Sequence, residues 1–216
     1  MKATYSISLL IVLAVGTLGC ASSGVNFSDG AFTQLQVGNT TAAQVSALLG
    51  KPLAEETASF DGVESVMKVY SYSKNTFELY SRTNVKSLHL EFIKGILNGL
   101  VYNNSFADSS TDFDSALRDS LVVGQSTKQK SVSLFGPHYG EVRLPTNLLN
   151  RTMPESYTRK IPQSAVEALV YYYRFLKEVE KRGGHFANHY KLLVLYFDNN
   201  GLLVDKVFTE NVIQPQ

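Results

Sequence analysis

A pattern of sixteen residues recurs in the chain. Residues 35–50 read LQVGNTTAAQVSALLG and residues 121–136 read LVVGQSTKQKSVSLFG. Both begin with Leu-x-Val-Gly, continue with Thr or Ser followed by Thr, and end on a second glycine twelve residues after the first. This duplication constrains the fold strongly, because one supersecondary unit used twice should keep its element types in both places.

Each copy carries signals that start and end a short helix. Thr40 and Ser126 stand where a hydroxyl can accept a hydrogen bond from the first free backbone N–H groups of a helix. Gly50 and Gly136 would end these helices, because glycine readily adopts the left-handed conformation found just past a helix end. We therefore predict one helix in each copy, N-capped by Thr40 and by Ser126.

The segments downstream of the two copies also match. Residues 87–102 and 191–208 each show apolar side chains at every second position, a turn that contains glycine, and a second strand. Residues 66–73 predict a further strand. Residues 167–181 are ambiguous, since Glu, Ala, Leu and Lys suit a helix whereas the Val-Tyr-Tyr-Tyr run suits a strand. The duplication favours a strand, which we place at 168–178.

These elements predict an α+β fold made of two tandem repeats of helix, helix and three antiparallel strands. The first repeat would cover residues 32–105, and the second, more divergent repeat would cover residues 118–212. Residues 106–117 are rich in Ser and Asp, so we interpret them as a linker. Each small sheet would then bury one face beneath its own helices.

The N-terminus predicts export. Residues 7–18 form an apolar run of 12, whereas a membrane-spanning helix needs about 20 apolar residues. With Lys2 before this run, residues 1–19 are interpreted as a signal peptide. Cys20 follows directly and is the only cysteine, which excludes a disulfide within the chain. Residues 20–31 are mostly small and polar and predict a flexible tether.

The region around Cys20 resembles the lipobox of bacterial lipoproteins. Small Gly19 stands before the cysteine and an uncharged apolar run precedes it. The resemblance implies a diacylglycerol on the Cys20 thiol, cleavage before Cys20 and acylation of the new amine. Ala21 is similar to the residue found in lipoproteins sorted to the outer membrane, which implies a lipid-anchored protein on its periplasmic side. The alternative is an ordinary secretory signal followed by an incidental buried cysteine.

The repeated motif and its hairpins resemble the SmpA/OmlA (BamE-like) family of outer-membrane lipoproteins. The resemblance implies a non-catalytic protein-binding accessory factor in envelope or β-barrel outer-membrane protein assembly. A tandem of the unit is also similar in layout to the β-lactamase inhibitor protein fold, so a protein-inhibitor or ligand-sensing module is the alternative. The residues that carry the family resemblance are Leu35, Val37, Gly38, Thr40, Val45, Leu48, Leu49, Gly50, Pro52, Tyr70, Tyr72, Leu90, Phe92, Gly95, Val123, Gly124, Ser126, Leu134, Phe135, Gly136, Phe197 and Gly201.

Charge and interface chemistry favour a protein partner, and the resemblances described above imply that this partner lies in the cell envelope. The net charge is +1, so we expect no nucleic-acid partner. Tyr171, Tyr173 and Arg174 are candidate partner-binding residues, because Tyr and Arg dominate protein interfaces. On a strand, Tyr171 and Tyr173 share one face. The alternative is that the tyrosines on one face of this strand belong to the core and those on the other face only cover the sheet.

No residue pattern predicts catalysis, a cofactor or a metal. His185 and His189 stand four residues apart with Asp198 downstream, but Gly183 and Gly184 precede them and suggest a loop in which metal geometry is undefined. The Asp-Asn-Asn-Gly sequence that starts at Asp198 lacks the alternating ligands of a calcium loop and predicts a turn. An envelope hydrolase is therefore the third alternative, behind the two binding functions.

Overall fold

The computed structural model describes residues 22–60, 62–77, 81–152, 161–178 and 186–213. About 50% of these residues lie in strands and 20% in helices. The strands are β1 (Ser22–Gly24), β2 (Ala54–Phe60), β3 (Val63–Phe77), β4 (Ser81–Ile93), β5 (Ile96–Asn104), β6 (Gly140–Arg143), β7 (Glu167–Glu178), β8 (Phe186–Phe197) and β9 (Leu203–Ile213). The helices are α1 (Asp29–Phe32), α2 (Ala42–Leu49), α3 (Lys128–Phe135) and α4 (Leu148–Thr152), with 3₁₀ turns η1 (Ala107–Ser109) and η2 (Ser115–Ser120).

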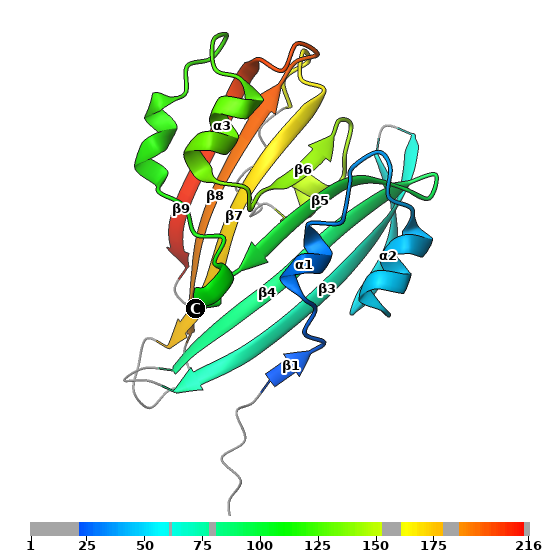
Figure 1. The fold of residues 1–216 in the computed structure, drawn as a ribbon, viewed down its shortest axis with the longest axis vertical. Helices are drawn as coiled ribbons and strands as arrows, with labels where there is room; N and C mark the ends of the chain where they lie inside the picture. The colour runs from blue at the N-terminus through cyan, green and yellow to red at the C-terminus, as the bar shows by residue number, and fades with distance from the viewer. Residues whose placement is uncertain (1–21, 61, 78–80, 153–160, 179–185, 214–216) are drawn as a thin grey trace, which may run out of the picture.

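All nine strands belong to one antiparallel sheet (Figure 1). Its order is β1-β3-β4-β5-β6-β7-β8-β9, and β2 pairs with β3 beside β1. β4 also pairs with β7 at its lower end, through Arg82 opposite Lys177 and Thr83 opposite Leu176. The pairings among β4, β5, β6 and β7 therefore form a closed circuit at the centre of the molecule.

The predicted fold class is wrong. The strands do not form two separate sheets in tandem helix-helix-three-strand repeats, because β6 and the β4–β7 pairing join them into one sheet. The repeat pattern identified which segments are strands, but it contains no information on how their edges pair. The outer edge of β5 presents unpaired backbone groups, and β6 satisfies some of them at Gly99 and Leu100.

The helices α1, α2 and α3 cover one face of the sheet, which we call the helix face. In Figure 1, α1 and α2 lie over β3–β5, and α3 lies over β7–β9. Leu100 packs in the core beneath α1 and α2, and Leu169 packs in the core beneath α3. The register through β6 places Leu100, Glu141 and Leu169 side by side, so both cores lie on the same face.

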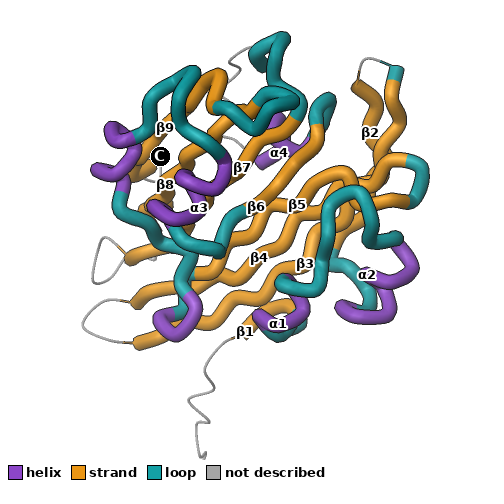
Figure 2. Tube along the Cα trace, turned by 45° about the horizontal axis from the view of Figure 1, so that its top comes forward, coloured by secondary structure: helices purple, strands orange, loops and turns teal. Residues whose placement is uncertain are grey.

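The other side of the sheet, which we call the opposite face, carries a third core. Gly99, Val142 and Ala168 share it by register. Figure 2 shows α4 behind the sheet near β7, and Leu148 of α4 and Leu149 are fully or almost fully buried in this core. α4 is therefore the helix that shields the opposite face within the described residues.

The repeated motif makes the same backbone contacts in both copies. The N–H of Gly38 donates to the carbonyl of Leu97 at 2.7 Å, and the N–H of Gly124 donates to the carbonyl of Leu203 at 2.8 Å. Both glycines have positive φ angles, 84° and 78°. In each copy the motif is thus bonded to the start of its second hairpin strand, β5 or β9.

The helix caps lie one residue later than predicted. Thr41 caps α2, with its hydroxyl accepting from the N–H of Gln44 at 3.2 Å, and Thr127 caps α3 in the same way. Thr40 and Ser126, the predicted caps, accept instead from the backbone N–H four residues earlier, at 2.9 Å in both cases. In each copy the first hydroxyl thus bonds to the loop before the helix, and the hydroxyl of the next residue caps the helix.

Several local predictions are confirmed. β4 and β5 form the first predicted hairpin, β8 and β9 form the second, and β7 covers the segment placed at 168–178. The Asp198 carboxylate accepts from the N–H groups of Asn200 and Leu202, both at 2.9 Å, which confirms the turn. No helix among the described residues is long and apolar enough to cross a membrane.

Residues 22–31, predicted to belong to a flexible tether, are bonded to the sheet together with Phe32. Ser22 pairs with Lys74 of β3, and Phe27 and Phe32 are buried beneath the first half of the molecule. The apolar rings at 27 and 32 explain the difference, because their burial offsets the entropy lost in ordering this polar segment.

Candidate interaction site

The strands β4 and β7 meet at a seam that is held by a side-chain amide. Asn103 at the end of β5 is 1% exposed. Its Oδ1 accepts from the N–H of Arg174 at 2.6 Å, and its Nδ2 donates to the carbonyl oxygens of Val85 at 3.1 Å and Arg174 at 3.4 Å. The amide therefore bridges β4 and β7, because it supplies a donor and an acceptor to the backbone of Arg174 and a donor to the carbonyl of Val85.

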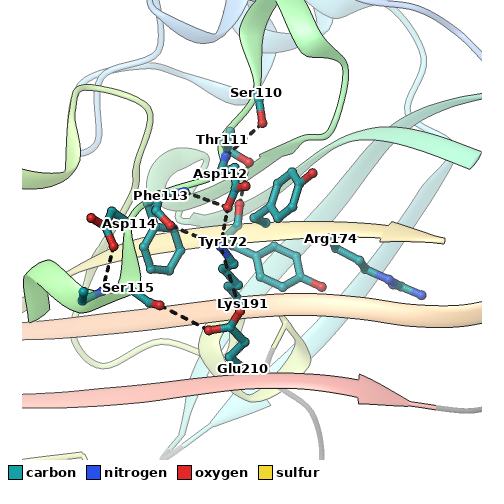
Figure 3. Close-up of polar contacts among 12 residues, drawn as sticks. Ser110, Thr111, Asp112, Phe113, Asp114, Ser115, Tyr172, Arg174, Lys191 and Glu210 are labelled. Carbon is teal, nitrogen blue, oxygen red and sulfur yellow. Dashed lines mark hydrogen bonds and ion pairs between the residues drawn. The ribbon is translucent and has the colours of Figure 1, made fainter. Parts of the chain in front are cut away.

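The segment after β5 crosses the second half of the sheet (Figure 3). The Thr111 hydroxyl donates to the carbonyl of Tyr172 at 2.7 Å and accepts from the N–H of Asn104 at 3.1 Å. Lys191 of β8 donates to Asp112 at 2.9 Å and to the carbonyl of Phe113 at 3.4 Å. Burial alone would lower the pKa of Lys191, but the hydrogen bond and charge of Asp112 outweigh it and raise the pKa.

The same contact exists in the first half. The ammonium of Lys86 donates to the carbonyl of Phe27 at 3.1 Å and lies 2.9 Å from Asp29. It stands 5.6 Å from the Phe27 ring centroid, as Lys191 stands 6.0 Å from that of Phe113. Phe27 and Phe113 are 86 residues apart, the separation of the repeated glycines, so sequence reasoning could have extended the duplication to these residues.

The predicted site residues Tyr171 and Tyr173 lie in the core. Tyr171 is 1% exposed and packs against Phe113, Phe135 and Tyr139. Tyr173 is 7% exposed, and its hydroxyl accepts from Arg82 at 2.9 Å. The structure therefore agrees with the alternative interpretation, that these two tyrosines pack rather than contact a partner.

Arg174, the third predicted site residue, is exposed on the opposite face. Its Nε donates to Oδ1 of Asn188 at 2.9 Å, and its backbone is fixed by Asn103. Burial raises the pKa of Tyr172, although the charge of Arg174 and a hydrogen bond from it act in the other direction. Arg174 thus lies on a rigid strand, oriented by its neighbours, and Figure 3 shows it apart from the 110–115 contacts.

His89 of β4 borders the same seam. Burial and the nearby positive charge of Arg174 lower the pKa of His89 to about 4. The imidazole is therefore neutral at pH 7. Arg174 therefore supplies the positive charge here. We use the name Arg174 cluster for this residue together with His89, Tyr172, Asn188 and Tyr190. Such a cluster can bind a carboxylate through the planar guanidinium of Arg174.

A second surface feature is a groove between the first helices. It encloses about 580 Å³ and is lined by the side chains of Gln34, Gln36, Asn39 and Gln44 with Leu48 at one wall. Leu48 is 39% exposed. Carboxamides both donate and accept, so this groove suits a neutral polar ligand such as a peptide backbone or a sugar.

Of the residues considered for metal binding, those that the structure describes make contacts that stabilise the fold. His185 lies outside the described residues. His189 stacks on Phe175 with the ring centroids 4.7 Å apart, and Asp198 holds its own turn. Glu91, which no sequence pattern singled out, is fully buried, and its carboxylate accepts from the backbone N–H of Asn147 at 2.8 Å. The described residues contain no group of three metal-ligating side chains.

Comparison with known proteins identifies no family. No protein-family model matches the chain, and no curated protein matches it at a significant level. Among solved structures, the chain is similar to a "putative beta-lactamase inhibitor protein" from Streptococcus mutans, with a TM-score of 0.42 and 14% sequence identity. The match covers 85% of this chain and 98% of that protein. At this level of similarity it supports no conclusion about fold or function.

Proposed function

We propose that this protein is a lipid-anchored lipoprotein on the periplasmic side of the outer membrane. In this proposal it binds a protein partner through the Arg174 cluster and acts as a non-catalytic accessory factor in envelope or β-barrel outer-membrane protein assembly. The observation that carries the binding part is the fixed orientation of Arg174. Asn103 holds its backbone, Asn188 holds its Nε, and the side chain is exposed.

The chemistry of this cluster favours a partner that presents an acidic side chain. A pre-oriented guanidinium loses little conformational freedom when it binds a carboxylate in a two-bond geometry. Tyr172 on the same strand and Tyr190, directly opposite Arg174 on β8, are buried in the opposite-face core and hold this part of β7 in place. The location and anchor rest on the resemblance of the Cys20 region to a lipobox.

The partner is tested by affinity purification from detergent-solubilised envelopes. Wild-type protein should recover a barrel-assembly component, and Arg174→Gln should lose most of it. Arg151→Gln is the matched control, because Arg151 is also exposed and forms an exposed ion pair with Glu56, 2.8 Å away. Equal recovery with both variants, or no barrel-assembly component with the wild type, would contradict the proposal.

The anchor is tested separately. Globomycin treatment or Cys20→Ala should leave the signal residues uncleaved and should prevent the mass increase caused by acylation. A mature protein that carries no lipid in untreated cells would refute the anchor without affecting the test of Arg174.

The groove lined by Gln34, Gln36, Asn39 and Gln44 supports a ligand-sensing module as the second candidate function. A thermal-shift screen with short peptides and oligosaccharides tests it. A ligand of this groove should raise the Tm of the wild type. It should not raise the Tm of Leu48→Arg, because the longer side chain would project into the groove. A shift that survives Leu48→Arg would exclude the groove as the binding site.

A further inference from the structure

The distance between the anchor and the folded chain is very short. β1 begins at Ser22, and one residue, Ala21, separates it from Cys20. Two residue steps span at most about 7 Å even when fully extended. This step rests on the lipid anchor of the proposed function. With that anchor in place, the start of β1 lies close to the bilayer surface.

β1 is held firmly at this position. Ser22 pairs with Lys74 and Gly24 pairs with Tyr72. Gly24 has a φ of +84°, and a Cβ there would lie 2.1 Å from the carbonyl oxygen of Ser71, so the two strands approach too closely for any other residue. The Lys86 contacts to Phe27 and Asp29 then hold the chain directly after β1.

The end of the sheet beside β1 is basic. Lys74 of β3, Arg82 of β4 and Lys177 of β7 all lie on the helix face, because side chains alternate along each strand. Arg82 and Lys177 are directly opposite each other in the β4–β7 pairing. Figure 1 shows the end of β3, the start of β4 and the end of β7 together at the lower end of the molecule, near β1.

The charge of this end differs from that of the whole chain. The described residues 72–77, 81–84, 174–178 and 186–190 together contain four basic residues and one acidic residue. Without Lys2 of the signal peptide, the remaining chain has equal numbers of basic and acidic residues. The positive charge at this end is therefore balanced by negative charge elsewhere on the protein.

The positive charge at this end affects the pKa of His189. Burial lowers the pKa of His189, and the charges of Lys177 and Arg82 lower it further. The Arg82 guanidinium stacks on the Phe175 ring at 4.3 Å, with the His189 ring also stacked on Phe175. Arg82 is thus held rigidly at the end of the sheet.

We propose that this basic end, formed by the end of β3, the start of β4 and the end of β7, rests on the anionic bilayer surface that carries the Cys20 anchor. The protein is then held in one orientation on the membrane. Basic side chains close to an anionic surface are attracted to it, and the short connection to Cys20 keeps them within the range of that attraction.

The orientation is tested with the acylated protein in vesicles of phosphatidylethanolamine and phosphatidylglycerol. Because the Cys20 thiol is occupied by lipid, Lys177→Cys and Lys130→Cys each provide a single thiol for a fluorophore. Energy transfer to a headgroup-labelled lipid should be strong from position 177 and weak from position 130 on α3. A Gly/Ser spacer inserted after Ala21 should abolish the difference. Equal transfer from both positions without the spacer would overturn the proposal while leaving the anchor intact.

The charge is tested without the anchor. The mature chain with Cys20→Ser should bind phosphatidylglycerol vesicles at low salt but not phosphatidylcholine vesicles. Lys74→Glu with Lys177→Glu should weaken binding by about tenfold or more, as expected for reversing two charges near the surface. Lys51→Glu with Lys130→Glu makes the same change in net charge elsewhere and should have a much smaller effect. Equal losses in the two double variants would overturn the proposal, even if Cys20 proves to be acylated in cells.

Discussion

Removal of the Asn103 side chain should destabilise the whole sheet. Asn103→Ala deletes the donor and the acceptor that bond to the Arg174 backbone, at 3.4 and 2.6 Å, together with the 3.1 Å bond to Val85. Each lost hydrogen bond contributes about 0.5–1.5 kcal/mol, and a buried group left without a partner costs about 1–3 kcal/mol. The Val85 carbonyl also accepts from the N–H of Ser105 at 3.0 Å, so it stays partnered.

The expected loss is therefore dominated by the two bonds to Arg174. We expect the free energy of unfolding to fall by about 3 kcal/mol, which corresponds to about 6–12 °C in Tm for a chain of this size. Asn103→Asp should be at least as damaging, because a carboxylate keeps the acceptor but has no donor for the two carbonyl oxygens.

Urea unfolding and amide hydrogen exchange provide the assay. Asn200→Ala, at an exposed turn position, serves as the control and should change the stability by less than about 0.5 kcal/mol. Asn103→Ala should also accelerate exchange of the Arg174 amide more than that of amides distant from the seam. A stability equal to that of Asn200→Ala, with unchanged protection at Arg174, would refute the argument that this amide joins the two halves.

Three further predictions concern pH and packing. Because the His89 pKa is about 4 when folded and about 6.5 when unfolded, stability should rise by about 3 kcal/mol between those pH values, and His89→Gln should flatten that rise in pH-dependent urea melts. Asp29, whose pKa is lowered despite the opposing effect of burial, stabilises the protein above the unfolded pKa and loses this effect as the pH falls through its folded pKa. Asp29→Asn should therefore be less stable than the wild type at pH 7 and similar to it in strong acid, as measured by thermal melts. Gly140→Ala should cost about 2 kcal/mol or more in urea melts, since its Cβ would lie 2.5 Å from the Leu100 carbonyl oxygen. Gly30→Ala should be nearly neutral, because the nearest atom to its Cβ would be the Ser28 hydroxyl oxygen at 4.0 Å.

The local elements could be predicted from the sequence because their causes are local. A hydroxyl before a helix and a glycine after it act within a few residues, so α2 and α3 follow from the repeated motif. The error of one residue at each cap arose because Thr40 and Thr41 both carry hydroxyls, and the pattern does not distinguish which one caps the helix.

The arrangement of the sheet could not be predicted, because its causes join residues far apart in the chain. Asn103 and Arg174 are 71 residues apart, and an asparagine at the end of a strand has no periodic signal. The short strand β6 is four residues long, and it depends on Gly140 to approach β5 closely. Neither feature differs from an ordinary loop when only the sequence is considered.

The burial of the tyrosine run could have been predicted from the sequence more firmly than it was. Strands buried on both faces carry continuous apolar runs rather than alternating ones. Residues 168–173 are such a run, and β7 lies between the helix-face core and the opposite-face core. The run therefore indicated a central strand, and Arg174, the first charged residue after it, is the first exposed position that follows.

The proposed binding residue depends on both halves of the duplicated chain. Arg174 comes from the second half, whereas Asn103, which fixes its backbone, and His89, which lies beside it, come from the first. A single copy of the unit would contain the repeated motif and its hairpin but would lack this seam. The joining of the two halves thus has a consequence that neither half has alone: it places a charged side chain on a rigid strand where two sets of strands converge. For this reason we expect substitutions at Asn103 to reduce partner binding through Arg174 as well as stability.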